Sequence, residues 1–198
     1  MQTAEAAIDR LCDPAAEVSA HYVICEGGNV TALVAEEMRA WHAGAGAWGA
    51  ITDVNSHSIG IELANTGAHP FPHPQMQALL GVLAELRTRW GIAPAGVIGH
   101  SDLAVGRKID PGPHFDWCAL ALQGHSIWPE TRAIQPRDPA EFWPAVRRIG
   151  YHWADGQEPD MIAAFRSRFR PMASGPVDAL DAAMACDLAD RFGQMPID

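Results

Sequence analysis

The clearest hydrophobic pattern in the chain covers residues 73–91 and is typical of a helix. Apolar side chains recur there at spacings of three and four, and Gly91 follows as a typical helix stop. The apolar stripe consists of Met76, Leu79, Leu80, Leu83, Leu86 and Trp90. We expect this stripe to face the core.

Shorter apolar stretches on both sides of this helix predict strands. Residues 18–25 and 30–34 flank a Gly-Gly turn and indicate a β-hairpin. Residues 57–65 are apolar enough for a strand in the middle of a sheet, and residues 96–101 indicate another short strand. A short first helix beginning at Thr3 precedes the hairpin.

The last third of the chain has a helical pattern of its own. Residues 129–138 have the composition of a linker, and three helix-like stretches follow it, over 138–150, 158–169 and 176–192. Asp138 and Glu141 form a capping box at the first of them. We therefore predict an α/β domain over 1–128, a mixed central β-sheet flanked by helices, and a small three-helix module over 139–195.

Charge and hydropathy narrow the classes of partner. The net charge of −10 argues against a nucleic-acid partner, because phosphate binding needs a basic face. No run of 18 apolar residues is present to span a membrane, and the first residues lack the cationic and apolar regions of a signal peptide. As given, the chain is therefore expected to be cytoplasmic, and we expect a monomer.

Three ionisable side chains lie on one loop rich in Gly and Pro, residues 99–117. His100 and Asp110 can both ligate a divalent cation if the loop brings them together. The alternative is a capped loop histidine and an Asx turn before Pro111. Lys108 favours the first interpretation, because a cation beside a ligand suits a site where negative charge develops during reaction.

Glu62 lies between apolar neighbours in IGIEL, where an unpaired carboxylate would be costly. It either pairs with a buried Lys or Arg, or it faces a site and moves protons. A metal, a base and a cation for an oxyanion together would suit the hydrolysis of an amide.

Four motifs, VSAHYVI, AWHAG, SIGIEL and GHSDLAVGRKIDPG, follow one another in the chain. In this order the sequence resembles the zinc-dependent N-acetylmuramoyl-L-alanine amidases of the type-2 group, over roughly residues 1–128. The resemblance implies His100 and Asp110 as Zn²⁺ ligands, Glu62 as catalytic acid/base, and Lys108 as the residue that stabilises the tetrahedral intermediate. The implied substrate is peptidoglycan or an anhydro-muropeptide, cleaved between N-acetylmuramic acid and L-alanine.

The helical stretch GYHWADGQEPDMIAAFRSRFRP resembles the peptidoglycan-binding domains that are attached to some of these amidases. The alternative is a plain three-helix cap on the enzyme.

The sequence departs from the family pattern at its start. The family's first zinc ligand is a histidine in an N-terminal strand, and the present sequence begins just after that position. We therefore expect the first strand and its ligand to be missing, and a periplasmic location if the true start lies upstream. His21 is a candidate substitute, or a residue packed behind the ligands, whereas His42, Trp41 and Trp48 are candidate substrate contacts.

The sequence is compatible with two functions. One is an active amidase, and the other is a muropeptide-binding protein that does not cleave. The presence of Glu62, Lys108, His100 and Asp110 together favours the enzyme, because pure binding has no need for an oxyanion cation beside an acid/base.

Overall fold

The computed structural model describes residues 3–130 and 135–193, which form two compact units. The first unit contains the residues up to Ala45 together with Asp53–Ile92, and the second contains Gly46–Thr52 together with the residues from Ala93 onward. Part of the predicted linker, residues 131–134, lies outside the described residues. The domain limits expected from the sequence stay a prediction.

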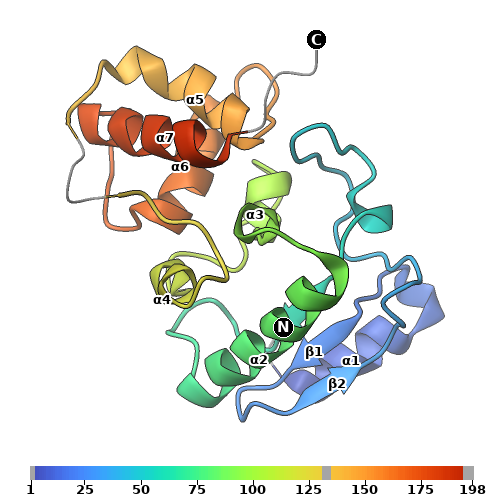
Figure 1. Cartoon of the computed structure of the whole chain (residues 1–198). Helices are drawn as coiled ribbons and strands as arrows, with labels where there is room; N and C mark the ends of the chain where they lie inside the picture. The colour runs from blue at the N-terminus through green and yellow to red at the C-terminus, as the bar shows by residue number, and fades with distance from the viewer. Residues whose placement is uncertain (1–2, 131–134, 194–198) are drawn as a thin grey trace. The chain divides into compact units, whose positions relative to one another are not determined.

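A three-stranded mixed sheet lies in the first unit (Figure 1). Strands β1 (Tyr22–Ile24) and β2 (Val30–Ala32) form the predicted antiparallel hairpin, and β3 (Ile61–Leu63) pairs parallel with β1. The order β2-β1-β3 makes β1 the middle strand among the described residues. The expectation that the 57–65 strand occupies the middle was therefore wrong.

Two helices contact the middle strand of this sheet. Helix α1 (Ala4–Cys12) begins at Thr3, whose hydroxyl accepts a hydrogen bond from the Ala6 amide at 3.2 Å. Helix α2 (His73–Trp90) ends at Gly91, which adopts a left-handed φ of 67°. The core of the unit is apolar and consists of Ala7, Ala20, Val23, Ile24, Ala64, Leu79, Leu83 and Leu86, among others.

The buried face of α2 differs from the predicted stripe at both ends. Gln75 is fully buried and donates to the backbone carbonyl of Ile24 at 2.9 Å, which closes the end of β1. Trp90 is 45% exposed. Trp90 is exposed because α2 is much longer than the strand that it packs against. A helix rises 1.5 Å per residue, so its 18 residues extend well beyond a strand of three residues.

The carboxylate of Glu36 joins the loop after β2 to the end of α2. It accepts hydrogen bonds from the Tyr22 hydroxyl, the Arg89 guanidinium and, at 2.5 Å, the indole N–H of Trp90. Mainly through the hydrogen bond from Arg89, these partners lower the pKa of Glu36 to about 2, from 4.5. The folded state therefore favours the ionised form.

We expect this carboxylate to make the first unit sensitive to acid. A lowered folded-state pKa stabilises the protein above the unfolded pKa, and that contribution is lost as pH falls from 4.5 toward 2. Because Arg89 is half exposed and screened by solvent, we expect Glu36→Gln to cost about 1–2 kcal/mol at pH 6. Urea unfolding of both proteins between about pH 3 and about pH 6, the interval in which carboxyl groups titrate, measures this difference in the free energy of unfolding. A constant difference across that interval would contradict the assignment.

The second unit contains most of the helices. They are η3 (Pro94–Gly96), α3 (His100–Leu103), α4 (Trp117–Leu122), η4 (Pro139–Glu141), α5 (Phe142–Ile149), α6 (Glu158–Phe169) and α7 (Ala179–Phe192). The two other short 3-10 turns, η1 (Pro14–Ala16) and η2 (Val54–Ser56), belong to the first unit.

The predicted strand at 96–101 is wrong. A 3-10 turn ends at Gly96 and α3 already begins at His100. The backbone carbonyl of Val97 accepts a hydrogen bond from the side chain of Arg168 at 2.9 Å, where a strand would use a neighbouring strand. A short apolar run cannot by itself distinguish these partners.

The C-terminal helices form the three-helix arrangement expected from the sequence, with α5 packed along α7 (Figure 1). The capping box is confirmed, because Asp138 accepts from the Ala140 amide at 2.9 Å and Glu141 accepts from the Asp138 amide at 3.3 Å. The rings of Phe142 and Phe165 pack edge to face at 5.1 Å in the core of these helices.

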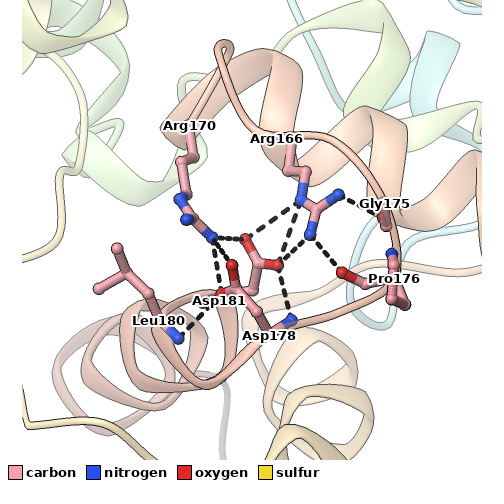
Figure 2. A network of polar contacts seen from close by, with 7 residues as sticks. All are labelled: Arg166, Arg170, Gly175, Pro176, Asp178, Leu180 and Asp181. Atoms are coloured by element: carbon pink, nitrogen blue, oxygen red, sulfur yellow. Dashed lines mark hydrogen bonds and ion pairs between the residues drawn. The ribbon is translucent and has the colours of Figure 1, made fainter.

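A buried polar network joins α6 to the start of α7, as Figure 2 shows. Arg166 forms an ion pair with Asp181, and both side chains are almost fully buried. The same guanidinium donates to the carbonyls of Gly175 and Pro176, each at 2.7 Å, so the turn between the helices is fixed by this one arginine. Arg170 adds a bond to Asp181 at 2.9 Å.

Among the described helices, none combines the length and the hydropathy that crossing a membrane requires.

Candidate active site

The loop that follows α3 turns back on the start of that helix. The carbonyl of Ala104 accepts from the amides of Arg107 and Lys108, both at 3.0 Å, and the Ser101 amide donates to the carbonyl of Asp110 at 2.9 Å. Gly106 permits the reversal because its φ of +75° is one that other residues rarely adopt. As a result, Nδ1 of His100 lies 3.1 Å from Oδ2 of Asp110.

The donor atoms of His100 and Asp110 fit two positions of one metal site. Two ligands held tetrahedrally at about 2.0–2.1 Å from zinc are separated by roughly 3.3 Å, close to the distance found here. An imidazole nitrogen and a carboxylate oxygen are both common zinc ligands. Within residues 3–130 and 135–193, no group of three or more His, Cys, Asp and Glu side chains gathers around a possible metal position.

Lys108 influences the electrostatics of this pair. Desolvation would raise the pKa of the Asp110 carboxyl, but the hydrogen bond and charge of His100, with the charge of Lys108, hold it below its usual value. Asp110 is therefore ionised at neutral pH, as a metal ligand must be. The Lys108 side chain itself is half-buried.

Glu62 belongs to the first unit and is the middle residue of β3. It lies in register with Val23 of β1, so the two side chains share one face of the sheet. Ile61 and Leu63 face the opposite side, and Glu62 is half-buried. The short strand thus fixes the direction of the carboxylate.

His21 has both ring nitrogens bonded to the backbone of its own unit. Its Nε2 donates to the carbonyl of Met38 at 3.0 Å, and its Nδ1 accepts from the amide of Gly60 at 2.9 Å. The side chain is fully buried. Ligating a metal would break one of these buried bonds, so the geometry favours the packed role over the substitute ligand.

His42 lies against the segment that leads into β3. The Ser58 hydroxyl donates its proton to the Val54 carbonyl, so it accepts a hydrogen bond from Nε2 of His42 at 2.9 Å. A Cβ on Gly60 would lie only 2.3 Å from the His42 ring, so this glycine admits the imidazole. The edge of His42 also meets His21, with ring centres 5.4 Å apart.

The two tryptophans expected to contact substrate differ sharply in exposure. Trp41, in the first unit, is 48% exposed and offers a face for stacking. Trp48, in the second unit, is 8% exposed and packs edge-on against Tyr151 at 5.0 Å. Trp48 therefore has the core-packing role, because little of its surface is left for a ligand.

A buried polar network that the sequence did not predict surrounds Asp102, two residues after His100 in α3. Asp102 and Arg168 form an ion pair at 2.6 Å, and the Tyr151 hydroxyl donates to Asp102 at 2.7 Å. Burial, together with the charge of Asp102, raises the pKa of Tyr151 well above its usual value, so the hydroxyl stays a donor. The sequence signal that could have indicated this network is Arg168, an arginine at a core position of the helix over 158–169.

Comparison with known proteins agrees with the resemblance noted from the motifs. The family described as N-acetylmuramoyl-L-alanine amidase matches residues 1–113 of the 198. This chain belongs to that amidase family. The resemblance inferred from the four motifs and the α/β fold with flanking helices are both confirmed.

The amidase is similar to two curated relatives. N-acetylmuramoyl-L-alanine amidase AmiD of Escherichia coli is 34% identical over 90% of this chain and 76% of its own. The 1,6-anhydro-N-acetylmuramyl-L-alanine amidase AmpD of Enterobacter cloacae is 40% identical, over 50% of this chain and 54% of its own. The match thus spans only about half of AmpD.

Among solved structures, the amidase is similar to AmiD from E. coli in complex with its substrate, anhydro-N-acetylmuramic acid-L-Ala-D-gamma-Glu-L-Lys. The TM-score is 0.89 and the identity 33%, over 96% of this chain and 86% of that one. The similarity therefore includes the C-terminal helices as well as the sheet.

Proposed function

We propose that this amidase hydrolyses the amide between N-acetylmuramic acid and L-alanine in peptidoglycan fragments, with anhydro-muropeptides as preferred substrates. The observation that carries the proposal is the approach of His100 to Asp110, 3.1 Å apart and under the charge of Lys108, in a chain of this family. The likeness to AmiD bound to an anhydro-muropeptide supports the choice of substrate.

We further propose that His100 and Asp110 are two protein ligands of a zinc ion. Their donor types and separation suit that metal, and the third protein ligand of a catalytic site is not found beside them among the described residues. When bound, a zinc ion supplies Lewis acidity, which polarises a carbonyl and makes water a stronger acid.

Two side chains of the protein then have separate roles, one in proton transfer and one in stabilising negative charge. Glu62 accepts a proton from the attacking water and delivers it to the nitrogen of L-alanine as the C–N bond breaks. The ammonium of Lys108 stabilises the negative charge on the carbonyl oxygen while the carbon is tetrahedral. The products are the carboxylate of the muramic acid and a peptide with a free amino terminus.

Substrate contacts come from the loop that carries AWHAG. Trp41 offers the exposed face on which a sugar or peptide can stack, and His42 supplies a polar neighbour. Trp48 is left out of this set because it packs against Tyr151. The monomeric state and the compartment stay predictions.

The second candidate function is recognition of muropeptide without cleavage. It is favoured by the absence of a three-residue ligand group in the part of the chain that the structure describes. Incubation of the zinc-supplemented protein with anhydro-N-acetylmuramyl tripeptide separates the two functions. We expect free tripeptide to accumulate with time, whereas binding without any change in substrate mass would establish the recognition function instead.

Removing the cation at Lys108 is expected to slow turnover without displacing the metal. We expect Lys108→Ala to lower kcat by about 10²–10³-fold, with little change in KM, because an oxyanion contact forms only in the transition state. Steady-state kinetics on the muropeptide measure this effect. Lys108→Arg, which keeps the charge, should recover part of the loss. Equal rates for Lys108→Ala and the unaltered protein would remove Lys108 from the mechanism.

A further inference from the structure

The arginine that neutralises Asp102 comes from helix α6, 66 residues further along the chain. Its guanidinium donates to Asp102 Oδ2 at 2.6 Å, to the Val97 carbonyl at 2.9 Å and to the Ser126 hydroxyl at 3.1 Å. It also lies over the ring of Trp117, 4.2 Å from the ring centre. Arg168 is 3% exposed and Asp102 1%, so the pair is shielded from solvent.

These bonds hold the chain on both sides of His100. Val97 precedes it by three residues and Asp102 follows it by two, and Arg168 binds both. The Asp102 carboxylate also accepts a hydrogen bond at 2.8 Å from the amide of Gly99, the N-cap of α3. One guanidinium therefore fixes the entry and the first turn of the helix that carries His100.

The same framework reaches the neighbour of Asp110. A Cβ on Gly99 would lie 2.8 Å from the ring of Pro111 and 3.2 Å from that of Trp117, so these three residues are in tight contact. Pro111 directly follows Asp110, and Trp117 supports Arg168. Arg168 thus binds residues on both sides of His100 directly. It reaches the neighbour of Asp110 indirectly, through Trp117, Gly99 and Pro111.

We propose that Arg168 is a positioning residue for the metal-binding pair, so that the C-terminal helices form part of the active-site scaffold. This inference rests on the zinc site of the proposed function. Helix α3 has only four residues, too few to hold its own geometry. A buried ion pair adds little net stability over an apolar pair of the same size, but its directed bonds specify one arrangement.

The chain provides a matched control in Arg166, on the same helix. Arg166 is also buried and also forms an ion pair with a buried aspartate, but its partners are Asp181 and the turn before α7 (Figure 2). Removing either arginine leaves a buried carboxylate without its main partner. The two variants should therefore lose similar stability and differ only in their effect on the metal site.

The test compares Arg168→Met and Arg166→Met in the full chain, with three readouts: melting temperature, zinc affinity by competition with a chelator, and kcat and KM for the muropeptide. We expect both variants to melt at lower temperature. Only Arg168→Met should bind zinc about 10–100-fold more weakly, the usual effect of removing a group that orients a metal ligand. Its kcat should fall while KM changes little, and Arg168→Lys should recover part of both losses.

Tyr151→Phe is a milder variant that tests the same proposal if Arg168→Met does not fold. It removes one hydrogen bond to Asp102 and no charge, and zinc affinity should fall several-fold. Unchanged zinc affinity in whichever of the two variants folds would overturn the proposal, as would an equal loss in Arg166→Met. An unaltered protein that neither binds zinc nor cleaves would overturn the proposed function, and the positioning role with it.

Discussion

Glu62→Gln is expected to lower kcat by about 10³-fold while the fold and the zinc content stay unchanged. Glutamine has the same shape as glutamate, so the register of β3 against β1 and the half-buried side chain should be retained. What is lost is the ability to take a proton from water and to return it to the departing amine. Single-turnover release of the free tripeptide, together with circular dichroism and metal analysis, measures all three quantities.

Glu85→Gln is the matched control for this substitution. Glu85 is a largely exposed carboxylate on α2 in the same unit, and its partner Arg89 is 3.7 Å away. Removing it should leave kcat within about twofold, since exposed ion pairs contribute little. If Glu62→Gln kept more than a tenth of the activity, Glu62 would not be the acid/base. The other role considered from the sequence, a structural ion-pair partner, would then apply.

Loss of either proposed ligand is expected to abolish zinc binding and, with it, turnover. We expect His100→Ala and Asp110→Asn each to reduce the zinc that the protein binds in equilibrium dialysis to a small fraction of the unaltered protein's, because His100 and Asp110 are the two proposed ligands among the described residues and losing either leaves one. Neither side chain belongs to the hydrophobic core, so the melting temperature without metal should change little. Metal analysis after dialysis measures the loss.

His73→Ala serves as the control for these ligand variants. His73 is exposed at the start of α2, and its loss should leave the zinc content unaltered. Full zinc occupancy in both His100→Ala and Asp110→Asn would place the metal elsewhere and would contradict the ligand assignment.

Local signals in the sequence predicted the elements whose geometry is set by near neighbours. Thr3 and Asp138 mark helix starts, and Gly91 marks a helix end, because a cap satisfies backbone groups only a few residues away. The approach of His100 to Asp110 was also foreseeable, since Gly and Pro residues close a short loop between them.

Local sequence signals could not predict contacts between residues that are distant in the chain. The Val97 segment is not a strand because its carbonyl is bound by Arg168, far along the chain. Trp90 is exposed because α2 is longer than the strands it covers, and strand length depends on pairing. Asp102 pairs with Arg168, which only the packed fold brings together.

The amidase is expected to cleave the bond between N-acetylmuramic acid and L-alanine with water. The most direct test is mass spectrometry of the products formed from anhydro-N-acetylmuramyl tripeptide in water enriched in oxygen-18, with zinc-supplemented protein. We expect one heavy oxygen in the carboxylate of the anhydro-muramic acid and none in the released tripeptide. Cleavage at a peptide bond within the tripeptide, or a substrate of unchanged mass after prolonged incubation, would contradict the assignment of this chain as a muramoyl-alanine amidase.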